Sequence, residues 1–157
     1  MMRFGCQDMV TQVRRILLKH PRDAFINQAT IDFQSSELNY SNTPDFEIAC
    51  KDYDQFLDLI RSFGPEIHFL PTSNTSLDSI YTHDPCIVTN RGAILCNMGK
   101  PQRSKEPDKI EKYFTSIGVP ILGHIEGNGT LEGGDIIWID ERTVAVGEGY
   151  RSNMEGI

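Results

Sequence analysis

The chain has 157 residues, of which 39% are apolar and 24% charged, as in ordinary globular domains that bury a hydrophobic core. Its formal net charge of −7 argues against a nucleic-acid partner, which needs clustered Lys and Arg, and is compatible with a small cationic ligand. No apolar run is long enough for a secretory signal or a membrane span, so we expect a cytoplasmic protein with no membrane partner.

The four cysteines are spread along the chain without any Cys-x-x-Cys spacing. A protein of this size in a reducing compartment has little use for a disulfide framework. We therefore interpret them as small buried hydrophobic residues: Cys6, Cys50, Cys86 and Cys96.

The first predicted element is a strand over residues 13–19, which His20-Pro21 would end. Residues 22–42 are polar and lack periodicity. We expect them to form a loop or to be poorly ordered, either as a cover over a substrate or as a long connection.

Helical spacing of apolar residues then predicts a helix over 44–63, with Thr43 as its N-cap and a proline at the first helical position. Gly64 is followed by a proline, and this pair would end the helix. Residues 67–70 predict a short strand.

A hairpin is predicted next, because the apolar runs 86–89 and 93–96 are separated by a turn-like Asn-Arg-Gly. A second helix has apolar residues on one face from Ile110 to Ile117 and would stop at Gly118. A strand at 120–125 and a further hairpin, with strands at 136–139 and 143–146, complete the pattern.

The two halves of this pattern repeat each other. Gly64 and Gly118 lie 54 positions apart, as do Asp78 and Glu132. A unit of about fifty residues with a helix and short strands cannot bury its apolar faces alone, which implies a closed or stacked array. Residues 151–157 resemble the opening turn of a third helix, so we expect the native protein to continue or a partner to supply the rest.

Equivalent positions of repeats around an axis converge, so Asp78 and Glu132 should face one central space. Arg103 and Arg151, which each follow a hairpin, should meet there as well. Such a pocket would suit a ligand with a cationic head and a carboxylate tail.

The segment GNGTLEGGD (127–135) is the clearest candidate in the chain for a functional motif. Its paired glycines either let the backbone approach a ligand closely or form a turn before a strand, and the segment alone leaves both open. Asp84 precedes a proline, so it is either a turn initiator or a site acid. His83 is a second candidate for the site, although a lone histidine is more often structural.

At this point the residues resemble a known family. LDSIYTHDPCIVTNRGAILCNMGKPQRSKEP (77–107) and GTLEGGDIIWIDERTVAVGEGYRSNMEGI (129–157) resemble the dimethylarginine dimethylaminohydrolases and, more distantly, the arginine deiminases and amidinotransferases. The resemblance is strong over 77–157 and weak before about residue 45. It implies an α/β pentein propeller of ββαβ repeats, of which residues 1–157 would be the N-terminal two to three units of a single domain.

The resemblance also implies roles for the site residues. Asp78 and Asp84 would be substrate-binding acids, and Glu132 would orient the catalytic histidine. Arg103 and Arg151 would hold the substrate's carboxylate end. Tyr81 replaces the family's phenylalanine, and His83 stands where many relatives carry an acid or an arginine, which leaves the side-chain specificity open.

The family's catalytic His and nucleophilic Cys would lie beyond Ile157. The implied reaction is attack of a thiolate on the guanidinium carbon of an arginine-like substrate, followed by hydrolysis of a thiouronium intermediate, with no metal or organic cofactor. An amidinotransferase and a catalytically dead guanidine-binding module remain alternatives. The oligomeric state is open, with a homo-oligomer among the options, and the isolated 157-residue chain should be inactive and unstable.

Overall fold

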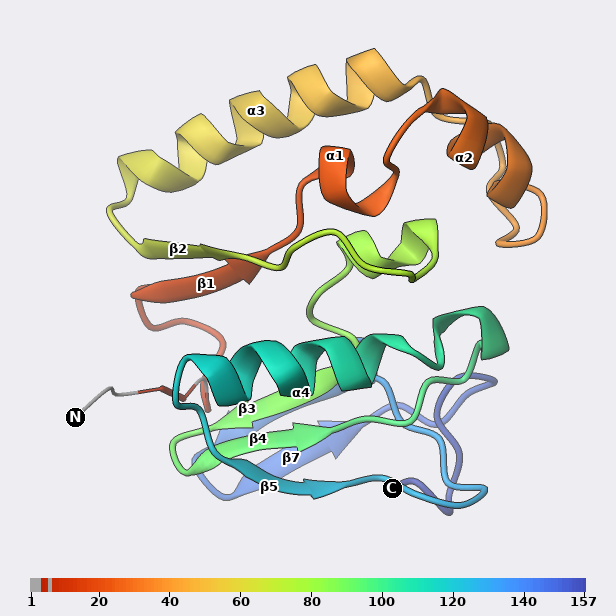
Figure 1. The fold of residues 1–157 in the computed structure, drawn as a ribbon. Helices are drawn as coiled ribbons and strands as arrows, with labels where there is room; N and C mark the ends of the chain where they lie inside the picture. Colours follow the sequence, from red (N-terminus) through yellow and green to blue (C-terminus); the bar gives the residue numbers. More distant parts are fainter. Residues whose placement is uncertain (1–3, 6) are drawn as a thin grey trace. The chain divides into compact units, whose positions relative to one another are not determined.

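The structure is a computed structural model that describes residues 4–5 and 7–157 (Figure 1). Cys6 therefore lies outside the described residues. The chain divides into two compact units, one of residues 13–82 and one of residues 83–157 with the N-terminal residues up to 12. Each unit is described by itself, and the expectation that 1–157 belongs to a single domain stays a prediction. Within the described ranges, no helix is long and apolar enough to cross a membrane.

The unit of residues 13–82 is built on two parallel strands. β1 (Arg15–Leu18) pairs with β2 (Glu66–Phe69), and α3 (Phe46–Ser62) lies between them in sequence as the crossover. Both strands confirm the predicted elements to within two residues. In Figure 1, α3 and the short α1 (Pro21–Ala24) lie on the same side of the strand pair.

The prediction that residues 22–42 form a loop is wrong. The segment contains most of α1 and the whole of α2 (Gln28–Gln34), and Ile31 of α2 is completely buried. The Asn27 side chain caps α2 by accepting a hydrogen bond from the Thr30 N–H. Helices of four and seven residues are too short to show a hydrophobic period, so no helical pattern could be recognised in this segment.

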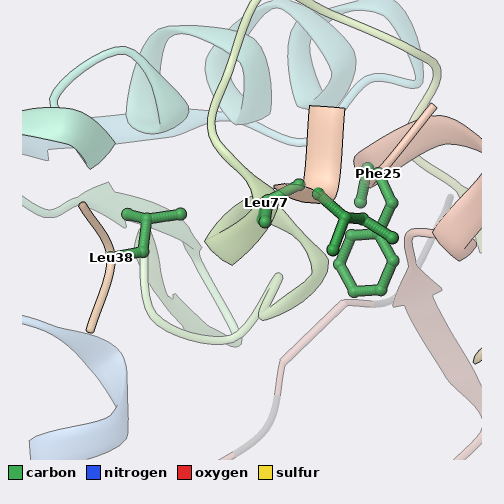
Figure 2. Close-up of a cluster of buried hydrophobic side chains, with 5 residues drawn as sticks. Phe25, Leu38 and Leu77 are labelled. Atoms are coloured by element: carbon green, nitrogen blue, oxygen red, sulfur yellow. The ribbon is translucent and has the colours of Figure 1, made fainter. Parts of the chain in front are cut away.

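The short helices and the residues that follow each of them supply four of the five members of a buried hydrophobic cluster. Figure 2 shows Phe25, Leu38 and Leu77 in this cluster. All members are at least nine-tenths buried: Ala24, Phe25, Ile31, Leu38 and Leu77. Burial of such side chains stabilises a fold by roughly 1.5–3 kcal/mol each relative to exposure.

The long helix α3 forms where periodicity predicts it, but its N-cap is Asp45 and not Thr43. The Asp45 carboxylate accepts a hydrogen bond from the Ile48 N–H at 2.9 Å, the geometry that an N-cap side chain requires. Thr43 stands two residues too early to reach that donor. Gly64, with φ of +77°, ends the helix as expected.

The second unit contains a complete ββαβ succession. β3 (Cys86–Thr89) pairs antiparallel with β4 (Gly92–Leu95), and α4 (Glu106–Ser116) leads to β5 (Ile121–His124), which pairs in parallel with β4. A separate hairpin of β6 (Ile136–Asp140) and β7 (Thr143–Val146) follows, also as predicted.

The repeat predicted from the sequence corresponds to a recurring order of elements: a helix, a strand and a 3-10 turn. Gly118 ends α4 with φ of +79°, nearly the value at Gly64, and in both places a strand and then a 3-10 turn follow. These turns are η1 (Leu77–Ile80) and η3 (Gly133–Asp135), so Asp78 and Glu132 occupy similar places in the two successions. The strands of the described residues form three separate sheets, none of which closes, and the closed propeller stays a prediction.

Residues 151–157 end in a single hydrogen-bonded turn, in which the Ile157 N–H donates to the Asn153 carbonyl at 3.1 Å, the i→i+4 spacing of a helix. The third helix itself stays a prediction. Asn153 also binds the glycine-rich segment: its N–H donates to the Thr130 carbonyl at 3.0 Å and its side-chain oxygen accepts from the Thr130 N–H at 3.0 Å. The same oxygen accepts from the Gly156 N–H. The Asn153 side chain is therefore placed as an N-cap, because it accepts from the N–H three residues later.

The buried position of Ile31 in the first unit allows a prediction of how its substitution changes the free energy of unfolding. Ile31→Ala should lower the free energy of unfolding by about 2–5 kcal/mol, since it removes a fully buried side chain. Phe33→Ala on the same helix, where the side chain is 73% exposed, should change it by less than about 0.5 kcal/mol. Urea unfolding of the complete gene product measures both, and equal effects would contradict a packed α2.

Candidate functional site

Two segments singled out in the sequence meet in the second unit. The Gly133 N–H donates to the Asp84 carbonyl oxygen at 2.8 Å, which joins the glycine-rich segment to the residues before β3. A Cβ on Gly133 would overlap the His83 carbonyl oxygen, and a Cβ on Gly134 would lie 2.7 Å from Asp84 Oδ1. The paired glycines thus serve close packing against residues 83–84, and neither has a positive φ.

Arg103, in the 3-10 turn η2 (Pro101–Arg103), lies at the centre of the cluster. Its Nε and Nη2 donate to the two carboxylate oxygens of Glu106 at 3.0 and 2.8 Å, and Nη1 donates to Asp84 Oδ2 at 2.7 Å. Burial by itself would lower the pKa of Arg103, but the bonds to Glu106 and Asp84 raise it. Arg103 is therefore a permanently charged group whose planar guanidinium is fixed along its edges by two carboxylates.

Glu132 is completely buried beside this ion pair. Its Oε1 accepts from the Gly99 N–H at 3.2 Å and its Oε2 accepts from Arg151 Nη1 at 2.9 Å, while Arg103 Nη1 lies 3.8 Å from Oε2. Burial raises the pKa of Glu132, and the two arginines partly oppose this rise.

Arg151 connects Glu132 to Asp135 and so extends the cluster. Its Nη2 donates to Asp135 Oδ1 at 3.1 Å, and the Ser152 hydroxyl donates to Asp135 Oδ2 at 2.6 Å. The Ser152 oxygen also accepts from the Glu132 N–H at 3.1 Å. Residues after β7 are in this way held against the glycine-rich segment.

The cluster divides into a buried and an accessible part. The side chains of Arg103, Glu106 and Glu132 are at most 3% exposed. Asp84, Asp135 and Arg151 retain 14%, 20% and 30% of their side-chain surface. The cluster holds four carboxylates, Asp84, Glu106, Glu132 and Asp135, and two guanidinium groups, Arg103 and Arg151. This excess of negative charge favours a cationic ligand.

The structure thus brings together Asp84, Arg103, Glu132 and Arg151, all of which the sequence proposed for one site. Asp78 belongs to the other unit, where it is 4% exposed, and its convergence with Glu132 stays a prediction. The role of His83, an exposed residue, also stays a prediction.

Glu106, Asp135 and Ser152 are site residues that sequence reasoning missed, although Asp135 lies in the glycine-rich segment that it singled out. Glu106 follows Arg103 by three positions, a spacing that brings side chains together in helical structure, and this signal could have found it. No comparable signal marks Ser152, because its partners lie 17 and 20 residues earlier in the chain.

The described cysteines are poor nucleophiles. Cys50, Cys86 and Cys96 are buried and free, as predicted from their spacing. Burial raises the pKa of Cys86 to about 12 and also raises the pKa of Cys50 and Cys96. The three thiols therefore stay protonated near neutral pH. No group of three or more His, Cys, Asp and Glu in the described ranges is arranged to hold a metal ion.

The family profile and the curated relative that match this chain carry the name of the same kind of enzyme. The family profile described as "N,N dimethylarginine dimethylhydrolase, eukaryotic" matches residues 20–157. The dimethylarginine dimethylaminohydrolase of Pseudomonas aeruginosa is 29% identical over 143 residues, which cover 91% of this chain and 53% of that protein. The chain spans about half the length of the curated relatives it matches.

Solved structures agree with these sequence matches. The structure of a mutant of the Pseudomonas aeruginosa enzyme in complex with citrulline has a TM-score of 0.74 at 25% identity, and the match covers 93% of this chain and 54% of that one. The N-terminal domain of a cyanobacterial arginine dihydrolase has a TM-score of 0.71 at 19% identity and covers 90% and 51%, which supports the fold alone. The α/β pentein fold implied by the sequence resemblance is confirmed.

The close packing of the glycine pair can be tested by adding one methyl group. Gly133→Ala should destabilise the protein by about 1–3 kcal/mol or more, because the new Cβ overlaps a backbone oxygen that cannot easily move. Gly123→Ala is the matched control, since nothing lies within 4 Å of its added Cβ. Thermal unfolding compares the two, and a Gly133→Ala protein as stable as the control would refute the packing of residues 83–84 on this segment.

Proposed function

Because the chain belongs to the N,N-dimethylarginine dimethylhydrolase family, we propose that its protein hydrolyses the guanidinium group of a methylated arginine or of arginine. The observation that carries the proposal is the convergence of Asp84 and Glu132 in one carboxylate-rich cluster. Citrulline, which is bound in the structure of the Pseudomonas aeruginosa relative, is the product that such a hydrolysis releases together with an amine.

Asp84 is the residue we assign to the substrate's guanidinium. Its carboxylate is partly accessible, and Arg103 fixes its orientation through the 2.7 Å bond to Oδ2. A carboxylate held in this way meets a planar cation without first having to become ordered. Asp78 is assigned to the substrate as a second acid, as the sequence resemblance implies.

We assign the substrate's carboxylate to Arg151 in preference to Arg103. Arg103 is buried, and its Nε, Nη1 and Nη2 all donate to Glu106 or Asp84. The Arg151 side chain is 30% exposed and lies at the accessible side of the cluster. Arg103 then acts on the substrate through Asp84, which differs from the direct contact that the resemblance implies.

The covalent step would use a cysteine thiolate that adds to the guanidinium carbon. A histidine protonates the leaving amine, and water then hydrolyses the thiouronium to citrulline and returns the thiolate. The raised pKa values of Cys50, Cys86 and Cys96 speak against these residues as the nucleophile. We assign the nucleophile and the catalytic histidine to residues outside these 157, and Glu132 to the orientation of that histidine.

A product assay tests the proposed activity. The complete gene product should release citrulline from dimethylarginine or arginine, whereas the 157-residue chain alone should release none. Citrulline and the released amine are measured by chromatography. Transfer of the amidino group to an added amine would replace the hydrolase by an amidinotransferase, and tight guanidine binding without any turnover would indicate a binding module.

A single substitution tests the site. Asp84→Asn should weaken binding of arginine and methylated arginines by about 10- to 100-fold, because the neutral amide loses a charge-assisted bond worth about 1.5–3 kcal/mol. Calorimetry measures the affinity, with the exposed Asp108→Asn on α4 as the control. Unchanged affinity in Asp84→Asn would remove this residue from the site.

A further inference from the structure

The end of helix α2 and the residues after it contact the 3-10 turn η1, which carries Asp78. The Gln34 side-chain oxygen accepts a hydrogen bond from the Leu77 N–H at 3.0 Å, and Leu38 lies with Leu77 in the buried cluster of Figure 2. Leu77 is completely buried and directly precedes Asp78. The backbone at Asp78 is therefore fixed by a segment about forty residues earlier in the chain.

Tyr40 reaches the Asp78 side chain itself. The Tyr40 hydroxyl donates to Asp78 Oδ1 at 3.0 Å. Its position is set by a tight turn after α2, in which Asn39 has φ of +62° and the Tyr40 N–H donates to the Ser35 carbonyl at 2.9 Å. The ring packs against the same hydrophobic cluster, so the hydroxyl is held in place from both sides.

The surroundings keep this hydroxyl a donor. Burial raises the pKa of the Tyr40 phenol, and the neighbouring Asp78 carboxylate and Tyr81 add to that rise. A protonated phenol donates one hydrogen bond, and a nearly buried carboxylate is the strongest acceptor it meets. Tyr40 thus restricts the rotation of the Asp78 carboxylate at every pH near neutrality.

We propose that Tyr40 is a positioning residue that sets the orientation of the Asp78 carboxylate, and hence the affinity for the substrate group that Asp78 binds. This inference rests on the proposed function, in which Asp78 is a substrate-binding acid. Tyr40 touches no substrate and acts through Asp78. A carboxylate whose plane is fixed in advance loses less entropy on binding, so the effect appears in binding and not in the chemical step.

Tyr40→Phe in the complete gene product tests the proposal, because it removes the hydroxyl and keeps the ring. We expect KM for the guanidine substrate to rise roughly 5- to 20-fold, with kcat changed less than about twofold. Tyr53→Phe is the matched control: Tyr53 is also half-buried in this unit, and its hydroxyl binds the backbone of Lys19 in place of a carboxylate. The control should leave KM unchanged while losing similar thermal stability.

A double-mutant cycle with Asp78→Asn separates positioning from a general loss of stability. If Tyr40 acts through Asp78, adding Tyr40→Phe to Asp78→Asn should raise KM by less than about twofold further. Full additivity, or an unchanged KM in Tyr40→Phe, overturns the inference while the proposed function stands. A wild-type protein that neither binds nor hydrolyses arginine or dimethylarginine overturns the proposed function, and the role of Tyr40 with it.

Discussion

The guanidinium of Arg103 is almost completely removed from water, where an unpaired positive charge would be strongly destabilising. Glu106 neutralises it along one edge and Asp84 along the other. These bonds connect three segments: the residues before β3, the turn η2 and the first turn of α4. Because the Gly133 N–H binds the Asp84 carbonyl, the glycine-rich segment depends on the same arrangement. Removal of the Arg103 charge would take away the cation that both carboxylates bind.

The solvent-accessible side of the charged cluster determines which ligand it can bind. Arg103, Glu106 and Glu132 are buried. Arg103 holds Asp84, and Glu132 holds Arg151, at the accessible side of the cluster. Asp84 offers a carboxylate and Arg151 a guanidinium, so a ligand that carries a cation at one end and an anion at the other matches both. An amino acid with a guanidinium side chain has this pattern of charges. The excess of carboxylates in the cluster then leaves it able to accept the ligand's cation.

The regular elements could be predicted from the sequence because each has a local cause. Helices α3 and α4 show a hydrophobic period and end at glycines with positive φ, and both hairpins join short apolar runs through polar turns. Residues 22–42 have no such local cause. Their helices span one or two turns, and a single side chain such as Ile31 supplies the burial, so only the tertiary contacts specify them.

The same distinction holds for the site. Asp84, Glu132 and Arg151 stand in motifs whose residue types already indicate charge recognition, whereas Tyr40 lies in a polar stretch 38 residues before its partner. Nothing local distinguishes it from the other tyrosines of the chain. Its place is set by the turn that ends α2 and by packing of the segment against Leu77, both of which are properties of the folded unit. Sequence motifs therefore identify the groups that meet a ligand, and the fold is needed to identify the groups that orient them.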